Sequence, residues 1–216
     1  MLEVKQIINC PIDSNCFVIY GMEKGGDCII VDPGSEDNSH LYELLKSEAL
    51  SPQFIILTHE HFDHCWGVNQ IVGQYNIPIV CSQRCAEAIK HEKRNCSVFY
   101  NNMEAFTIKS ETISIESIGN ELQFGDDMIR FYNTPGHTDA SISFVADKYL
   151  FTGDTLIKDE KTVTKLPTGS VEKLSETVKI LAELKGLGLE VKSGHGEEFM
   201  LDDYDLEKMT RGRLNN

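Results

Sequence analysis

The segment of residues 58–64 constrains this chain more than any other feature of its sequence. It reads Thr-His-Glu-His-Phe-Asp-His and concentrates three imidazoles and a carboxylate in six residues. These are His59, His61, Asp63 and His64. The segment directly follows an apolar run, residues 54–57, that predicts a buried strand. Because a loop at the end of a strand opens into a crevice and not into a core, its side chains are predicted to meet there.

The donor types in this segment are those of a metal site. Divalent cations such as zinc favour imidazole and carboxylate ligands. The spacing of two residues lets the rings of His59 and His61 turn to one ion, and Asp63 and His64 then lie where they can meet a second. The segment therefore predicts metal binding.

Three further segments place a metal-binding residue type just past a strand-like run. His137 lies in Thr-Pro-Gly-His-Thr, Asp154 in Thr-Gly-Asp-Thr and His195 in Ser-Gly-His-Gly. Five of the seven histidines thus fall at predicted strand ends. The other two, His40 and His91, fall in helical segments and are predicted to face solvent.

The balance of charge limits the classes of partner. With 34 acidic and 20 basic residues the formal net charge is -14 at pH 7, which argues against a nucleic-acid partner because such proteins present basic faces. No apolar stretch approaches the roughly 18 residues of a membrane span, so no membrane partner is expected. The start of the chain does not resemble a signal peptide, and the odd count of seven cysteines suggests reduced thiols, so we expect a cytoplasmic protein.

The order of apolar segments predicts an α+β fold. We find no repeat or linker, and we expect one domain over residues 1–216. Strands are predicted at residues 16–20, 28–32, 54–57, 78–81, 111–116, 128–132, 141–145, 149–152 and 190–193. Helices are predicted around Leu41, Leu44 and Leu45 and at residues 63–74, 83–91, 170–184 and 203–211. Two sheets packed face to face with helices outside, a four-layer αββα sandwich, would bury these strands.

Taken together, these segments resemble those of a known family. The pattern His-x-His-x-Asp-His of residues 59–64, followed by the segments around His137, Asp154 and His195, is similar to that of the metallo-β-lactamase superfamily. The resemblance covers nearly the whole chain and implies the αββα sandwich. It implies one metal held by His59, His61 and His137. It implies a second held by Asp63, His64 and His195, with Asp154 bridging both.

The resemblance also indicates a branch and a reaction. Asp154 is typical of the short glyoxalase II-like (hydroxyacylglutathione hydrolase-like) hydrolases, whereas related β-lactamases generally carry another residue there, which argues against antibiotic hydrolysis. The implied reaction is hydrolysis of a small-molecule substrate, an S-2-hydroxyacyl thioester such as S-lactoylglutathione. A hydroxide shared by two divalent metal ions, zinc or alternatively iron or manganese, would attack it. Asp63 is then the catalytic residue that orients the hydroxide and accepts its proton.

The sequence departs from the family pattern in its second half. Full-length glyoxalase II has a helical region beyond its last histidine that helps to bind glutathione, and only 21 residues follow His195 here. An arginine that often precedes a Leu-Pro pair is absent. Lys158, Lys161 and Lys165 could receive a substrate carboxylate or serve only as solvated side chains.

Three other residues stand near the motifs. Asp32, at the end of a strand, is implied to fix a metal ligand from below. Cys65 is predicted to be a buried packing residue and not a ligand. Cys81 and Cys85 have no partner pair at zinc-finger spacing, so no structural zinc is expected there.

Other functions on the same pattern remain open. A persulfide dioxygenase would use one iron held by His59, His137 and Asp154. A lactone or small phosphodiester could replace the thioester as the substrate of a hydrolase. A metal-binding regulatory protein is the non-enzymatic alternative, which the presence of all seven expected ligands argues against.

Overall fold

The computed structural model describes residues 1–22, 25–101 and 104–211. The chain divides into two compact units, which we call unit 1 (Met1–Gly119) and unit 2 (Asn120–Asn216). Each unit contains one six-stranded sheet with strands in both orientations. Whether the two units act as the single hydrolase domain expected from the sequence stays a prediction.

The sheet of unit 1 has its strands in the order of the chain, from β1 to β6. The strands are β1 (Leu2–Ile8), β2 (Asn15–Gly21), β3 (Gly26–Val31), β4 (Leu50–Ile56), β5 (Ile79–Cys81) and β6 (Thr112–Ser114). The first three are antiparallel neighbours, and β3 to β6 are parallel. Parallel strands point their carboxyl ends to the same edge, so the segments after β3, β4 and β5 start there.

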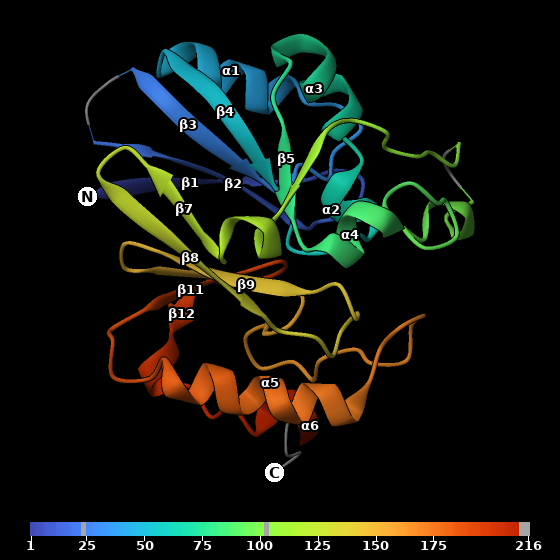
Figure 1. Cartoon of the computed structure of the whole chain (residues 1–216), viewed down its shortest axis with the longest axis vertical. Helices are drawn as coiled ribbons and strands as arrows, with labels where there is room; N and C mark the ends of the chain where they lie inside the picture. The colour runs from blue at the N-terminus through green and yellow to red at the C-terminus, as the bar shows by residue number, and fades with distance from the viewer. Residues whose placement is uncertain (23–24, 102–103, 212–216) are drawn as a thin grey trace. The chain divides into compact units, whose positions relative to one another are not determined.

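Short helices connect these strands. They are α1 (Ser39–Ser47), α2 (Phe62–Cys65), α3 (Val68–Tyr75), α4 (Gln83–Ala88) and the 3-10 helices η1 (Ser97–Phe99) and η2 (Ile115–Ile118). Figure 1 shows α1 and α3 on the same side of this sheet. Helix α1 buries Leu41 and Leu45, and α3 buries Val68 and Ile71, so each directs an apolar stripe inward.

The predicted helix over residues 63–74 is wrong in one respect, because the structure divides it into α2 and α3. The turn between them holds Gly67, whose N–H donates to the carbonyl of Pro33 at 2.8 Å. A Cβ on Gly67 would lie 2.4 Å from Oδ1 of Asn38. The approach of another loop therefore divides the helix, and such a tertiary contact leaves no periodic signal in the sequence.

Unit 2 has the sheet order β12-β11-β10-β9-β8-β7. The strands are β7 (Glu121–Phe124), β8 (Asp127–Asn133), β9 (Ile142–Ala146), β10 (Tyr149–Gly153), β11 (Glu190–Ser193) and β12 (Phe199–Met200). All neighbours are antiparallel except β10 and β11, which are parallel and joined through α5 (Val171–Glu183). Leu174 and Leu181 of α5 join one buried cluster with Leu150 of β10 and Val191 of β11.

The end of the described chain differs from the predicted closing helix. The 3-10 helix η3 (Leu201–Asp203) and the short helix α6 (Lys208–Arg211) replace a continuous helix over residues 203–211. Figure 1 shows α6 beside α5, and the two are in contact. The helix predicted over residues 83–91 ends earlier, at Ala88, and the predicted strand over residues 111–116 passes into η2. Strands β1, β7 and β12 were not predicted from the sequence.

Ser170 caps α5 by accepting a hydrogen bond from the N–H of Lys173. The side chains of His40 and His91 are exposed, which confirms the prediction that they face solvent. Among the described residues, no helix is long and apolar enough to cross a membrane.

Candidate metal centre

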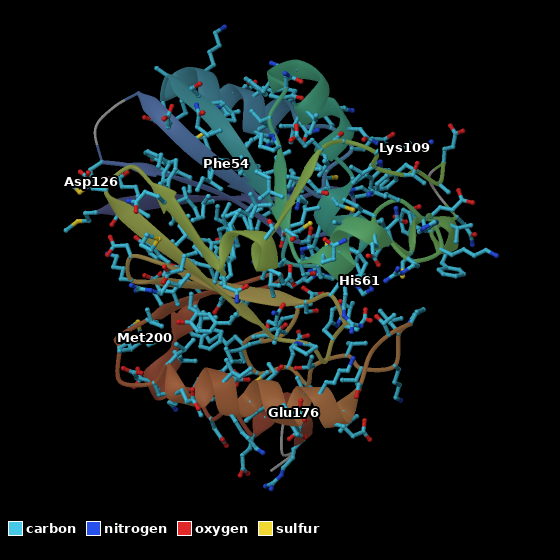
Figure 2. The ribbon with its side chains drawn as sticks, in the orientation of Figure 1. Phe54, His61, Lys109, Asp126, Glu176 and Met200 are labelled. Atoms are coloured by element: carbon cyan, nitrogen blue, oxygen red, sulfur yellow. The ribbon has the colours of Figure 1, made fainter. Side chains whose placement is uncertain are left out.

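The segment of residues 58–64, which we call the ligand loop, follows β4 in unit 1. Its residues are predominantly buried although they are polar: His59, His61 and His64 expose 1%, 5% and 0% of their surface. Nε2 of His59 lies 3.1 Å from Nδ1 of His61. Two nitrogens bound to one tetrahedral zinc at about 2.0–2.1 Å lie about 3.3 Å apart. The pair is thus spaced as two ligands of a single cation. His61, labelled in Figure 2, is the residue that directly precedes α2.

Asp32 supports this loop from the end of β3. It is 2% exposed, and its Oδ1 accepts the N–H of Thr58 at 2.8 Å. Its Oδ2 accepts the hydroxyl of Thr58 at 2.6 Å and lies 3.0 Å from Nδ1 of His64. One oxygen of Asp32 and ring nitrogens of His59 and His64 all lie within 4.8 Å of one another. Because both oxygens already accept hydrogen bonds, Asp32 fits the supporting role that the family pattern implies.

These bonds assign the tautomers of two histidines. Nδ1 of His64 donates to Asp32, so its Nε2 carries the lone pair. The hydroxyl of Thr58 is used as a donor to Asp32, so its oxygen accepts the Nδ1–H of His59, 3.1 Å away. Nε2 of His59 is therefore also an acceptor. Both rings present a nitrogen in the form that a cation requires.

The backbone of Asp63 is held by close contacts. A Cβ on Gly34 would lie 1.5 Å from the carbonyl oxygen of Asp63, so only glycine fits at position 34. The hydroxyl of Ser14 donates to the same carbonyl. The side chain of Asp63 is 15% exposed, and its Oδ2 lies 3.7 Å from Nε2 of His64. Asp63 thus combines a fixed backbone with a carboxylate that solvent can reach.

Unit 2 brings together the other three predicted ligands, each from a different strand end. Oδ2 of Asp154 lies 3.6 Å from Nε2 of His137 and 3.6 Å from Nε2 of His195. Asp154 follows β10, His137 follows β8 and His195 follows β11. A carboxylate oxygen this close to two imidazole nitrogens can join them in binding a cation.

His137 is fixed by main-chain contacts. Its Nδ1 donates to the carbonyl of Val163 at 2.8 Å, which leaves Nε2 as the acceptor. The preceding residue, Gly136, has φ 152°, and a Cβ there would lie 2.8 Å from Cα of Leu174 in α5. Only glycine allows the loop to approach the helix so closely. The packing of α5 therefore sets the position of the His137 ring.

The donor sets fit divalent cations. Unit 1 offers His59, His61, Asp63 and His64, and unit 2 offers His137, Asp154 and His195. Three of the five imidazoles have Nδ1 held by an oxygen of the protein, as metal-binding histidines generally do. The structure thus brings together the predicted residues of each unit.

Several supporting residues were not found from the sequence. Ser14 holds Asp63, Thr58 links Asp32 to His59, and the carbonyl of Val163 holds His137. The side chain of Asn9 contacts Ser14 and the carbonyl of Asp32. None of these residues lies in a recognisable spacing except Thr58, which adjoins the ligand segment.

The remaining candidate residues behave as packing or surface residues. Cys65 is fully buried, which confirms the packing role predicted for it, and burial raises the pKa of its thiol. Cys81 and Cys85 are also buried. Lys158 forms an ion pair with Glu197 at 3.0 Å, and Lys161 and Lys165 are exposed.

Comparisons with known proteins identify similar sequences. The model of the metallo-β-lactamase superfamily matches residues 11–187. The probable metallo-hydrolase YqgX of Bacillus subtilis is 31% identical over 206 residues, with 94% of each chain covered. A hydroxyacylglutathione hydrolase of Pectobacterium atrosepticum is 27% identical over 179 residues, which are 82% of this chain and 61% of that protein.

A solved structure is similar over almost the full length. The crystal structure of the BLEG-1 B3 metallo-β-lactamase matches with a TM-score of 0.81 and 30% identity, covering 92% of this chain and 94% of that one. Together with the two mixed sheets, this match confirms the predicted fold class, the α+β sandwich of the metallo-β-lactamase type.

Proposed function

Because the chain belongs to the metallo-β-lactamase superfamily and is a hydrolase of that superfamily, we propose that it hydrolyses an S-2-hydroxyacyl thioester. The ligand sets of the two units would hold two divalent cations, zinc being the first choice. The similarity to a hydroxyacylglutathione hydrolase supports the thioester as the substrate class.

Asp154 is the observation that carries this proposal. Its carboxylate oxygen lies equally close to His137 and His195, which belong to different predicted metal sites. One carboxylate can supply a ligand oxygen to each of two cations, so Asp154 would be the residue shared by both sites. In the proposed set, His59, His61 and His137 would hold one cation. Asp63, His64 and His195 would hold the other.

The protein's own groups would prepare the reaction. Cations bound by these residues would lower the pKa of a water molecule and polarise the carbonyl of the substrate. The carboxylate of Asp63 is reached by solvent, so it can accept a hydrogen bond from the attacking water and then its proton at Oδ2. The close fit of Gly34 against the main chain of Asp63 keeps that carboxylate in place while the proton moves.

A thioester suits these groups because its leaving group needs little help. Water adds to the thioester carbon as one of its protons passes to Asp63, and the carbon–sulfur bond breaks with its electron pair on sulfur. The products are a carboxylic acid, which loses its proton to solvent, and a thiolate. The thiolate is a weak base with a pKa near 8.5. It can take up the proton that Asp63 received, so no further strong acid is required.

A panel of substrates tests the proposal. Thioesters, lactones, phosphodiesters and β-lactams are each assayed on protein reconstituted with zinc, manganese or iron. We expect the S-2-hydroxyacyl thioester to have the highest kcat/KM, and Asp63→Ala to lower it by roughly 100- to 10,000-fold. A variant that turns over near the wild-type rate would show that Asp63 does not have this role.

The metal content separates the hydrolase from a mononuclear dioxygenase. Two cations per chain with thioester hydrolysis support the proposal. One iron per chain, with oxygen consumed and no thioester cleaved, would replace it by an iron dioxygenase that uses His59, His137 and Asp154.

The similarity to BLEG-1 makes β-lactam hydrolysis a second candidate. A β-lactam also has a carbonyl that water attacks, but its leaving group is an amine nitrogen that must be protonated. Higher kcat/KM for a β-lactam than for any thioester in the panel would favour this second candidate.

A further inference from the structure

The segment between α4 and β6 carries a local charge opposite to that of the whole chain. Residues 90–94, which we call the basic turn, read Lys-His-Glu-Lys-Arg. Their formal charge is three positive and one negative, in a chain whose net charge is -14. Figure 1 shows the segment between α4 and β6 extending away from the strands of unit 1. Lys109, labelled in Figure 2, lies farther along this segment than the basic turn.

Within the residues that the structure describes, the cations of the basic turn have no partner. In the described parts of the chain, the side chains of Lys90, Lys93 and Arg94 form no ion pair and no hydrogen bond. Elsewhere acidic residues do pair with lysines, as Glu197 does with Lys158. Three unpaired cations within five residues repel one another, so an anion bound among them would be stabilised.

The basic turn lines a cavity. The cavity has a volume of about 680 Å³ and is lined by Lys90, His91, Glu92, Lys93, Arg94 and Thr107. This volume is within the usual range of sites for small molecules. One cation is enough to hold a single carboxylate, whereas several cations around one cavity fit a group with more than one negative charge, such as linked phosphates.

An aromatic cluster connects the basic turn with the ligand loop. We define this cluster by Phe62, Trp66 and Tyr100. Phe62 lies between two predicted ligands, His61 and Asp63, and its ring stacks on Tyr100 with centroids 5.2 Å apart. All three rings are half-buried, so each leaves part of a face or edge open to a ligand.

Main-chain hydrogen bonds join the aromatic cluster to the basic turn. The N–H of Val98, two residues before Tyr100, donates to the carbonyl of Glu92 at 3.2 Å. The path from Phe62 through Tyr100 to Glu92 is therefore roughly 20 Å or less. Phe99, next to Tyr100, is 65% exposed, which makes its ring a free surface for stacking.

We propose that the basic turn and the aromatic cluster bind the thiol carrier of the substrate, and that this carrier bears phosphate groups and an aromatic base. This inference rests on the proposed thioester hydrolysis. The phosphates occupy the cavity lined by Lys90, Lys93 and Arg94, and the base stacks on an exposed ring such as Phe99. The flexible arm of the carrier crosses the aromatic cluster, so that the thioester reaches the ligand loop beyond Phe62.

Binding of coenzyme A, a thiol that carries phosphates and adenine, tests the site without any turnover. We expect it to bind the wild-type protein, and a triple variant with Lys90→Gln, Lys93→Gln and Arg94→Gln to bind it at least tenfold more weakly. The control variant Lys5→Gln, Lys46→Gln and Lys179→Gln removes the same charge from exposed positions elsewhere. Equal weakening in both variants, or no binding to the wild type, would overturn the proposal.

A second measurement compares two thioesters of the same acyl group. One has coenzyme A as its carrier, and the other has N-acetylcysteamine, which lacks phosphate and base. We expect the wild type to favour the coenzyme A thioester at least tenfold in kcat/KM, and the triple variant to lose this preference through KM while cleaving the small thioester unchanged. An unaltered preference in the triple variant would contradict the assignment.

The two measurements separate failure of this inference from failure of the proposed function. If coenzyme A binding depends on the basic turn but neither thioester is cleaved, the phosphate site is supported and thioester hydrolysis is wrong. If the small thioester is cleaved and coenzyme A is neither bound nor preferred, thioester hydrolysis is supported and the carrier site is wrong.

Discussion

Unit 1 and unit 2 position their predicted ligands in different ways. Unit 1 supplies four ligands from one short loop, and a buried carboxylate, Asp32, fixes that loop through Thr58 and His64. Unit 2 supplies three ligands from three separate strand ends, and His137 is fixed by donating a hydrogen bond to a main-chain carbonyl. We infer that the geometry of unit 1 depends on particular side chains, and that of unit 2 on the register of its sheet and the packing of α5.

Replacing the ligand shared within unit 2 should have the largest effect. Asp154→Asn keeps the shape but removes the charge that faces His137 and His195, so we expect roughly a 1,000-fold loss of kcat/KM, because metal charge stabilisation is worth several kcal/mol. Steady-state kinetics with metal analysis measures it. The control is Asp126→Asn, an exposed aspartate at a turn. Equal activity in the two variants would contradict the role of Asp154.

Replacing Asp32, the support of unit 1, should have the next largest effect on the metal site. Asp32→Asn places an amide NH2 where three donors converge, so we expect metal affinity to fall about 10- to 100-fold and the free energy of unfolding to fall by about 2 kcal/mol. Metal titration and urea unfolding measure the two quantities.

Replacing Val163, the counterpart of Asp32 in unit 2, should have almost no effect on metal binding or stability. His137 bonds to the carbonyl of Val163, whose side chain is 51% exposed, so Val163→Ala leaves that bond in place. We expect the free energy of unfolding to change by no more than about 0.5 kcal/mol. If Val163→Ala weakened metal binding as strongly as Asp32→Asn, the distinction between the units would be lost.

Close packing behind the ligand loop gives a third, purely structural test. The Cβ of Gly34→Ala would meet the carbonyl of Asp63, so we expect a loss of about 3 kcal/mol in the free energy of unfolding. The matched change Gly73→Ala, in the exposed interior of α3 with nothing within 4 Å, should instead gain about 0.5–1 kcal/mol. Chemical unfolding of both variants checks the opposite signs. A tolerated Gly34→Ala would show that the loop is less tightly held than its contacts indicate.

A further test concerns the thiols, all seven of which lie in unit 1. Cys10 is exposed and the other six are buried; burial raises the pKa of Cys28 to about 12 and that of Cys65 well above its usual value. We expect one thiol per folded chain to react quickly with a thiol reagent at pH 8, and none in Cys10→Ser. Fast reaction of several thiols would show that unit 1 opens readily.

Because burial raises the pKa of these thiols, the free energy of unfolding should depend on pH. Above about pH 8.5 the unfolded chain loses thiol protons that the folded unit 1 keeps, so the unfolded state binds fewer protons. The free energy of unfolding should therefore fall as the pH rises through that value. Urea unfolding between pH 7 and pH 10, followed by a probe in unit 1, would measure the slope.

The two units also differ in how readily their metal ligands can be predicted from the sequence. The ligands of unit 1 are contiguous, so their spacing alone indicates them. Those of unit 2 were predicted because His137, Asp154 and His195 each follow a strand-like run, although only the folded sheet brings them to 3.6 Å. Asp32 was identified through family resemblance, and its bonds to Thr58 and His64 agree with that role.

Features that depend on tertiary contacts were not predicted. Strand β1 is half-exposed and its sequence lacks clear alternation, so its pairing with β2 supplies what the pattern does not. The division between α2 and α3 depends on the approach of Gly67 to another loop. Ser14 and Val163 act through their contacts to Asp63 and His137, which no spacing encodes. The cytoplasmic location stays a prediction.

The central claim is that seven side chains of the two units hold one pair of cations. Anomalous diffraction from crystals grown with zinc tests it most directly. We predict two peaks per chain, about 3.5–4 Å apart. One contacts His59, His61 and His137, the other Asp63, His64 and His195, and Asp154 contacts both. A single peak, or peaks that leave out the ligands of either unit, would contradict the account.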